Sequence, residues 1–147
     1  MSTATFSGGG AALDHDALDR AEGELELEFP EALRELYLRS NGGRPPPSIF
    51  VDARGDDYEV HSFKSFGEPG SSGVSIEETH RSLVARGLLP KDLVPIAMDS
   101  GGNLYCVDTS GAVFFLPMDV PDARAILIAE ALSAFVERLV TAEEAYG

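Results

Sequence analysis

The chain of 147 residues lacks tryptophan, has one cysteine and carries few cationic side chains. With Cys106 alone no disulfide can form within the chain, which fits a reducing compartment. No stretch approaches 18 consecutive apolar residues, so we expect no transmembrane helix. The N-terminus has neither the basic segment nor the apolar core of a signal peptide. Together these absences predict a cytoplasmic protein.

Cations are scarce relative to acids: 11 Lys and Arg stand against 25 Asp and Glu, which gives a formal net charge of −14. Because such a surface has no surplus cations to replace phosphate counterions, we expect it to bind neither nucleic acid nor anionic lipid. It would instead attract a basic protein and accelerate the encounter with it. The simpler alternative is that the acidity keeps the protein soluble.

Length and composition are ordinary for one globular domain, with 44% apolar and 24% charged residues. A chain of this length buries roughly two-thirds of the surface of its unfolded form, so it needs no disulfide or metal to fold. Residues 1–12 are mostly Gly, Ala, Ser and Thr, which predicts a flexible tail. We therefore expect a single domain over residues 13–147.

Two helices are predicted after the tail. Leu18, Ala21 and Leu25 recur at three- and four-residue spacing, which is typical of an amphipathic helix. Phe29-Pro30 interrupts this pattern and restarts it, because a proline at the first helical position removes no helical hydrogen bond. Asn41-Gly42-Gly43 then offers residues that tolerate the left-handed conformation common at helix ends.

Short runs with β-type composition follow at residues 49–51 and 58–63, separated by a turn-rich segment. Ser75 and Glu78 form a capping box, in which each side chain accepts from the other's backbone amide. This pattern predicts a middle helix that ends at Gly87.

Three apolar runs at residues 93–98, 104–107 and 112–116 are joined by short segments with turn chemistry. Because short connections require antiparallel pairing, these runs predict a β-meander. A further strand at residues 125–128 precedes a C-terminal helix. The predicted fold class is α+β: a central antiparallel β-sheet (meander) flanked by two N-terminal helices, a middle helix and a C-terminal helix.

The order of these motifs resembles the SUKH superfamily, which includes Smi/Knr-type cell-wall-assembly regulators and bacterial SUKH immunity proteins. Four segments carry the resemblance, within about residues 14–140: Ala21-Glu22 with Phe29-Pro30-Glu31-Ala32-Leu33; Ser40-Asn41-Gly42-Gly43; Leu93-Val94-Pro95-Ile96-Ala97-Met98-Asp99 with Gly101-Gly102-Asn103 and Tyr105-Cys106-Val107-Asp108; and Ile128-Ala129-Glu130 through Phe135-Val136. The chain departs from the family at Phe115-Leu116-Pro117-Met118-Asp119, where a Trp-Asp-His-type ending is frequent.

The resemblance implies a protein-binding module that catalyses no reaction. Many family members are immunity proteins that neutralise a toxin, often a nuclease, and others are adaptors in assembly complexes. Combined with the net charge, it implies an immunity protein that neutralises a polymorphic toxin, such as a basic nuclease, by occlusion. The alternative is an adaptor or scaffold domain of a regulatory or assembly complex without a toxin partner.

Acidic residues gather in two segments, residues 14–35 and 52–59. In a basic nuclease groove, carboxylates can take the positions of nucleic-acid phosphates. Tyr58, Phe63 or Phe66 would then serve as apolar anchors of the contact. The alternative is that these acids form a solvated face. The candidate partner-binding residues are Glu24, Glu26, Glu28, Asp52, Asp56, Asp57, Tyr58, Glu59 and Asp99.

The sequence offers no evident catalytic, metal or cofactor site. Cys106 lies in an apolar run without a neighbouring cation, so we expect a buried thiol rather than a nucleophile. His15, His61 and His80 lack the spacing of metal ligands. Gly101-Gly102-Asn103 lacks the Lys and Ser/Thr of a phosphate-binding loop, which predicts a hairpin turn. A hydrolase that uses Cys106 or a carboxylate pair remains the enzymatic alternative.

Overall fold

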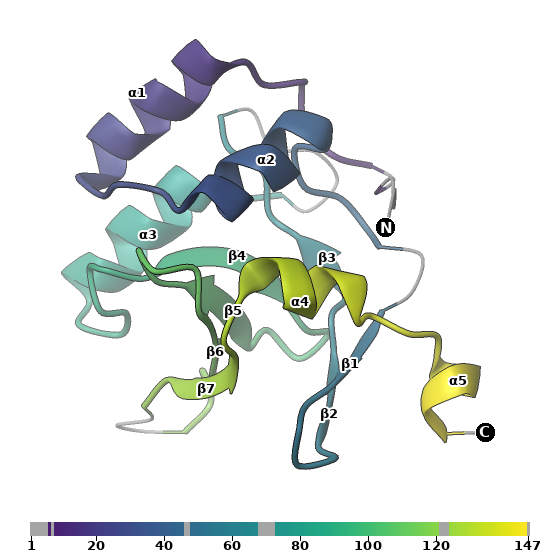
Figure 1. Cartoon of the computed structure of the whole chain (residues 1–147). Helices are drawn as coiled ribbons and strands as arrows, with labels where there is room; N and C mark the ends of the chain where they lie inside the picture. The colour runs from purple at the N-terminus through teal and green to yellow at the C-terminus, as the bar shows by residue number, and fades with distance from the viewer. Residues whose placement is uncertain (1–5, 7, 46–47, 68–72, 121–123, 147) are drawn as a thin grey trace.

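The computed structural model describes residues 6, 8–45, 48–67, 73–120 and 124–146 (Figure 1). Figure 1 shows α1 and α2 above the larger sheet and α4 lying across it, with the β1–β2 hairpin projecting from the body. Within the described residues the elements are α1 (His15–Leu25), α2 (Glu31–Arg39), β1 (Ile49–Val51), β2 (Asp57–Glu59), β3 (Ser62–Phe63), α3 (Ile76–Ala85), β4 (Val94–Met98), β5 (Leu104–Val107), β6 (Val113–Leu116), β7 (Ile126–Ala129), α4 (Leu132–Glu137) and α5 (Ala142–Tyr146).

The two predicted N-terminal helices are confirmed. The carboxylate of Asp14 caps α1 by accepting from the amide of Ala17 at 2.8 Å. The helix ends at Leu25, and the next residue, Glu26, adopts the left-handed conformation with φ of 56°. Pro30 immediately precedes α2, where its missing N–H leaves no unpaired donor. Helix α1 contacts α3, and α2 contacts α4.

The predicted meander is also confirmed, so the fold is α+β. Strands β3 to β7 form one antiparallel sheet in sequential order. Two aspartates organise the tight turns between its strands. Asp99 accepts from the amides of Gly101 and Asn103, both at 2.9 Å. Asp108 does the same for the amides of Ser110 and Ala112, both at 3.0 Å.

The prediction of one continuous β-run over residues 58–63 is wrong, because the chain changes its pairing partner within it. Strand β2 pairs with β1, whereas β3 pairs with β4 of the larger sheet. The change falls between Val60, whose amide donates to Ser48 O, and His61, whose amide donates to Met98 O. Side-chain alternation shows that a segment is extended but does not show which neighbour it pairs with.

The predicted C-terminal helix is present but short. Helix α4 ends at Glu137, and Val140 then pairs with Ile49 through two backbone hydrogen bonds of 2.7 and 2.9 Å. This pairing requires extended backbone at Val140, so the helix cannot continue. A separate short helix, α5, follows.

The main core is built around Phe135 of α4, which is fully buried. Its ring centroid lies 4.8 Å from that of Phe50, 5.7 Å from Tyr105 and 6.4 Å from Phe63. A smaller cluster around Cys106 includes buried leucines of β5, β6 and the loop before β4. Burial raises the pKa of the Cys106 thiol to about 12, so Cys106 is a buried, un-ionised thiol, as predicted.

The predicted flexible tail over residues 1–12 needs correction for Phe6 and residues 8–12. Phe6 is buried and stacks on Phe63 with 4.7 Å between ring centroids. The amide of Gly10 donates to Asn41 O at 2.8 Å. Glycine-rich composition indicated freedom of the backbone, but it did not reveal that a single aromatic side chain finds a place in the core. Residues 1–5 and 7 lie outside the described part of the chain.

Candidate protein-binding surfaces

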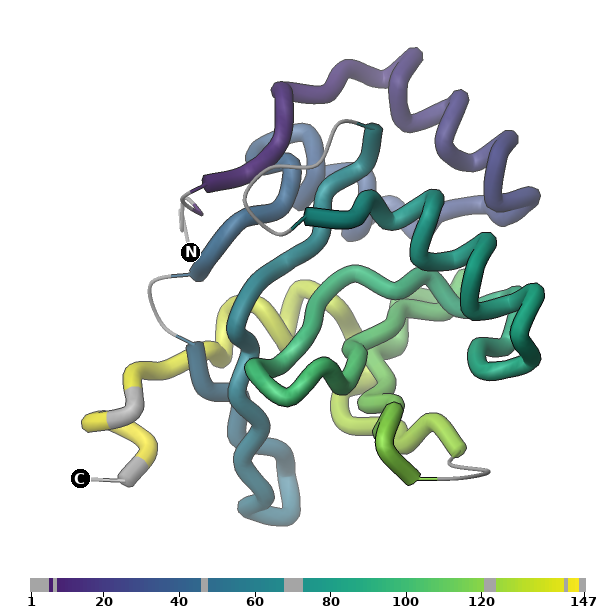
Figure 2. The backbone as a smooth tube through the Cα atoms, turned by 180° about the vertical axis from the view of Figure 1, so that it is seen from behind, coloured from purple at the N-terminus to yellow at the C-terminus, as the bar shows by residue number. Residues whose placement is uncertain are grey.

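Four of the predicted partner-binding acids lie close together at one end of the molecule. Asp56, Asp57 and Glu59 belong to the β1–β2 hairpin and Asp99 to the β4–β5 turn, and we call these four the hairpin acidic surface. Glu59 joins the two elements, because its carboxylate accepts from the amide of Ser100 at 3.0 Å and from its hydroxyl at 2.7 Å. The backbone view of Figure 2 shows the hairpin at the far end of the molecule from α1.

Asp52, a fifth candidate, lies beneath this surface rather than on it. Its side chain accepts from the amides of Arg54 and Asp56, both at 2.9 Å, and pairs with the Arg54 guanidinium at 3.2 Å. Burial opposes ionisation, but the backbone hydrogen bonds from Asp56 and Arg54, together with the Arg54 guanidinium, outweigh it and lower the pKa of Asp52. We therefore assign Asp52 to the hairpin turn.

The aromatic anchors expected from the sequence occupy different environments. Tyr58 is partly exposed on the hairpin, and its ring lies 5.3 Å from that of Phe115. The prediction for Phe63 and Phe66 is wrong, because both side chains are in the core. Phe66 stacks on Phe29 at 5.3 Å, a contact between residues too distant in sequence for a local pattern to show.

The remaining candidates, Glu24, Glu26 and Glu28, form a separate helical acidic surface at the C-terminal end of α1. Glu24 and Glu26 line a hollow of about 570 Å³ between α1 and α3. The hollow also contains Glu77, a residue that the sequence analysis missed. Burial, with a smaller contribution from the charge of Glu24, raises the pKa of Glu77. The predicted acids are therefore divided between two surfaces.

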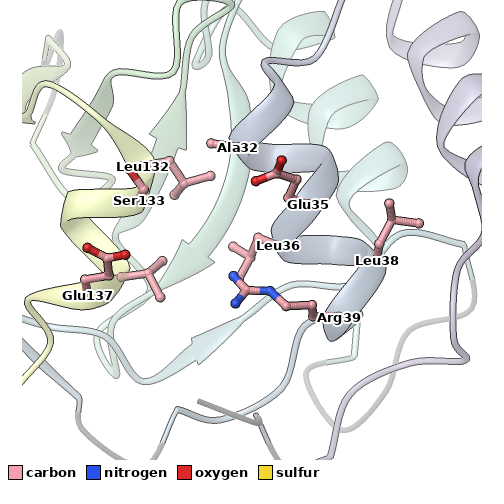
Figure 3. A pocket seen from close by; sticks show the side chains of 9 residues that line it. Ala32, Glu35, Leu36, Leu38, Arg39, Leu132, Ser133 and Glu137 are labelled. Carbon is pink, nitrogen blue, oxygen red and sulfur yellow. The ribbon is translucent and has the colours of Figure 1, made fainter. Parts of the chain in front are cut away.

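A third feature is an apolar groove of about 420 Å³ between α2 and α4 (Figure 3). Leu36 and Leu132 contribute its apolar walls, and Glu35, Arg39 and Glu137 add charged groups. Figure 3 shows the Arg39 guanidinium directed from α2 toward α4. The sequence did not reveal this groove, because its two walls are about 100 residues apart along the chain.

The Asn-Gly-Gly segment after α2 is structural. Asn41 is buried. Its side-chain NH₂ group donates to Phe66 O at 2.9 Å and to Ala11 O at 2.8 Å. Its side-chain oxygen accepts from the Phe66 amide at 2.8 Å. Gly42 has a φ of 79°, and a Cβ there would lie 2.6 Å from Lys64 O. No residue with a side chain fits this approach of two backbones.

These contacts explain why Asn and Gly stand at this position in the motif that resembled the SUKH superfamily. The sequence profile of the SMI1 / KNR4 family (SUKH-1) matches residues 12–138, which is most of the chain. The chain belongs to this family. Its SUKH-1 domain thus extends from just before α1 to the end of α4.

The SUKH-1 domain is similar to a solved structure, the crystal structure of a protein from Pseudomonas syringae pv. tomato. The two share 19% sequence identity with a TM-score of 0.54, over 89% of this chain and 88% of the other. At this identity the likeness shows the fold alone. No curated protein matches the sequence.

Across the described ranges of the SUKH-1 domain no group of three or more His, Cys, Asp or Glu side chains is arranged to hold a metal ion. No helix in the same ranges combines the length and apolarity needed to cross a bilayer.

Lys64 is a buried cation that the sequence analysis did not single out. Lys64 is only 5% exposed, and its ammonium group donates a hydrogen bond to Val74 O at 3.3 Å. Among the described residues no carboxylate pairs with it. Burial lowers the pKa of Lys64, since an ammonium loses hydration there.

We expect Lys64→Met to leave the free energy of unfolding at neutral pH unchanged or to raise it by about 1 kcal/mol, because an apolar side chain avoids the desolvation of a buried charge. Since the folded pKa of Lys64 is lowered, wild-type stability should rise with pH between the folded and unfolded pKa values, and the variant should lack this rise. Urea unfolding at neutral and alkaline pH measures both effects, with exposed Lys91→Met as control. A clear loss of stability in Lys64→Met alone would contradict this account.

Proposed function

We propose that this SUKH-1 domain is an immunity protein that binds a basic toxin domain in the cytoplasm and blocks its active surface. The hairpin acidic surface is the main contact. The observation that carries this proposal is that two of its carboxylates are already held in place, Glu59 by Ser100 and Asp99 by the amides of its own turn. Side chains that are ordered before binding lose less conformational entropy when they meet cationic groups.

The charge distribution supports the same proposal. Arg34, Arg54 and Arg81 form ion pairs with acidic side chains, but the 11 Lys and Arg of the chain cannot neutralise its 25 acidic residues. Most carboxylates therefore contribute to a negative field that steers a basic partner toward the domain. Inhibition then requires only occlusion, and no residue of this chain has a catalytic role in the proposal.

We expect the double variant Asp57→Asn and Glu59→Gln to slow association with the toxin domain about tenfold at low salt, because it removes charge from the contact. The matched control, Glu24→Gln with Glu26→Gln, gives the same net charge but changes the helical acidic surface. It should slow association no more than about twofold.

The probe is the toxin domain encoded beside the gene, and the readouts are survival on co-expression and association rate by surface plasmon resonance. The double variant of the hairpin acidic surface should protect cells less well than the control. Absence of both rescue and complex formation with the wild-type chain would contradict the proposal. Equal effects of the two double variants would reject the hairpin acidic surface as the contact.

An adaptor role in an assembly complex is the second candidate, and the groove between α2 and α4 favours it. An apolar groove with charged edges suits an amphipathic helix of another protein. Ser133 is exposed and lines this groove. Ser133→Arg should abolish recovery of an adaptor partner in a pull-down and leave toxin rescue intact. Loss of toxin rescue in this variant would instead assign the groove to the immunity role.

A further inference from the structure

Strand β7 is an open edge of the five-stranded sheet. It is the last strand in the order β3 to β7, and within the described ranges it pairs with β6 alone. The opposite edge strand, β3, is partly covered. Its Phe63 exchanges two backbone hydrogen bonds of 2.9 and 2.7 Å with Gly43, which follows α2. Each molecule therefore presents one open edge of this sheet, visible as the outer side of β7 in Figure 1.

This edge also carries exposed apolar side chains. Ile126 is 41% exposed and Leu127 is 49% exposed, although both are in a regular strand. Unpaired backbone groups beside exposed aliphatic side chains are the features that favour pairing with another strand. Ile128 is an extra residue between the positions of β7 that pair with Val113 and Phe114, and this bulge keeps the regular part of the strand short, which limits extended aggregation.

The charges around β7 are complementary to themselves. Arg124 and Glu130 lie three residues before and three residues after Leu127. Both are exposed, and neither makes an ion pair with another described residue. When two copies of β7 pair antiparallel about Leu127, Arg124 just before the strand of one copy lies near Glu130 just after the strand of the other. Opposite charges at such positions stabilise the pairing.

The charges beside β7 are close to balanced, so two acidic copies repel each other less there than elsewhere. Arg54 and Arg138 line a hollow of about 550 Å³ next to the strand. Arg138 is held there by a 3.2 Å hydrogen bond to Val51 O and by the ring of Phe50, 5.6 Å from its guanidinium carbon. On a chain with a net charge of −14, this is a region where the charge is close to balanced.

We propose that two copies of this chain associate through β7, paired antiparallel about Leu127, so that their sheets become continuous. The assembly stops at two copies, because each copy has one open edge of the sheet. Pairing of single edge strands buries a small area, so the dimer forms reversibly and at high protein concentration. The dimer does not require the toxin contact proposed above.

Sedimentation equilibrium of the full chain over a wide concentration range tests the proposal. The wild-type mass should rise from one copy toward two. Arg124→Glu and Glu130→Arg should each raise the dimer dissociation constant about tenfold, because each places like charges opposite one another twice. An equimolar mixture of these two variants should restore the dimer, since each offers the charges that the other needs.

Leu127→Lys should abolish the dimer, because the two introduced ammonium groups would meet on the two-fold axis. Arg20→Glu, an exposed change of the same charge away from β7, should leave the dissociation constant unchanged. Circular dichroism checks that each variant is folded. A wild-type chain that stays monomeric at all concentrations, or a mixture that associates no better than the single variants, would overturn the proposal.

Discussion

Replacing Phe135 with alanine is expected to lower the free energy of unfolding by about 4 kcal/mol, because the change removes a fully buried ring and leaves a cavity. Its neighbours come from three different strands: Phe50 from β1 of the small sheet, Tyr105 from the central strand β5 of the large sheet, and Phe63 from its edge strand β3. Rings held from three separate elements cannot all move to fill the space, so the effect should be near the upper end for this kind of change.

Urea denaturation followed by circular dichroism measures this loss. Val136→Ala is the matched control, because Val136 is the next residue of α4 but is only partly buried. It should lower stability by about 1 kcal/mol. Because small domains are stable by only about 5–15 kcal/mol, Phe135→Ala should also be visibly less soluble on expression. Similar losses in the two variants would show that the core is not centred on Phe135.

Replacing Asn41 with alanine is expected to lower the free energy of unfolding by about 3 kcal/mol. The Asn41 side chain forms hydrogen bonds with both the backbone amide and the backbone carbonyl of Phe66, which is only 2% exposed. Without it these two backbone groups stay buried and unpaired, and each such group is destabilising by about 1–3 kcal/mol. The side chain also holds Ala11 O, so the contact of the N-terminal segment should weaken as well.

Asn103→Ala is the matched control for this loss, since Asn103 also bonds its surroundings through both ends of its amide. It donates to Asp99 at 3.0 Å and accepts from the Met118 amide at 2.8 Å. Because Asn103 is partly exposed, water can replace these bonds, and the loss should be about 1 kcal/mol. A loss in Asn41→Ala no greater than in Asn103→Ala would contradict the role assigned to Asn41.

The elements that could be predicted from the sequence are those defined by local patterns. The apolar spacing of Leu18, Ala21 and Leu25 indicated α1, and these three side chains are its buried face. The turn chemistry around Asp99 and Asp108 indicated the meander, because these aspartates bond the backbone of their own turns. Where the interactions are within a few residues, composition and spacing were sufficient.

Features that depend on long-range contacts could not be predicted in this way. The change of pairing partner after β2 depends on the hydrogen bond from the His61 amide to Met98 O, two groups that are 37 residues apart in the sequence. Phe6 looked like one residue of a flexible tail, but its ring stacks on Phe63. Phe63 itself looked as available for binding as Tyr58. Only the packing of distant segments separates an exposed aromatic residue from a buried one.

The candidate site was predicted in part. The cluster at residues 52–59 does lie near Asp99, but Asp52 is used inside the hairpin turn. The acids of α1 lie on another surface, because the helix runs at the far end of the molecule from the hairpin (Figure 2). A turn in which an aspartate carboxylate accepts from the backbone amides that follow it has a recognisable composition. The position of Asp52 at the start of such a turn could therefore have indicated its structural role.

Hydrogen–deuterium exchange of the chain, alone and with the toxin domain encoded beside its gene, tests the central claim most directly. The account predicts slower exchange on binding in the β1–β2 hairpin at residues 56–59 and in the turn at residues 99–103. The amides of α1 should exchange at the same rate in both states. Protection confined to α1, or no protection anywhere in a complex that forms, would contradict the claim that the hairpin acidic surface binds the partner.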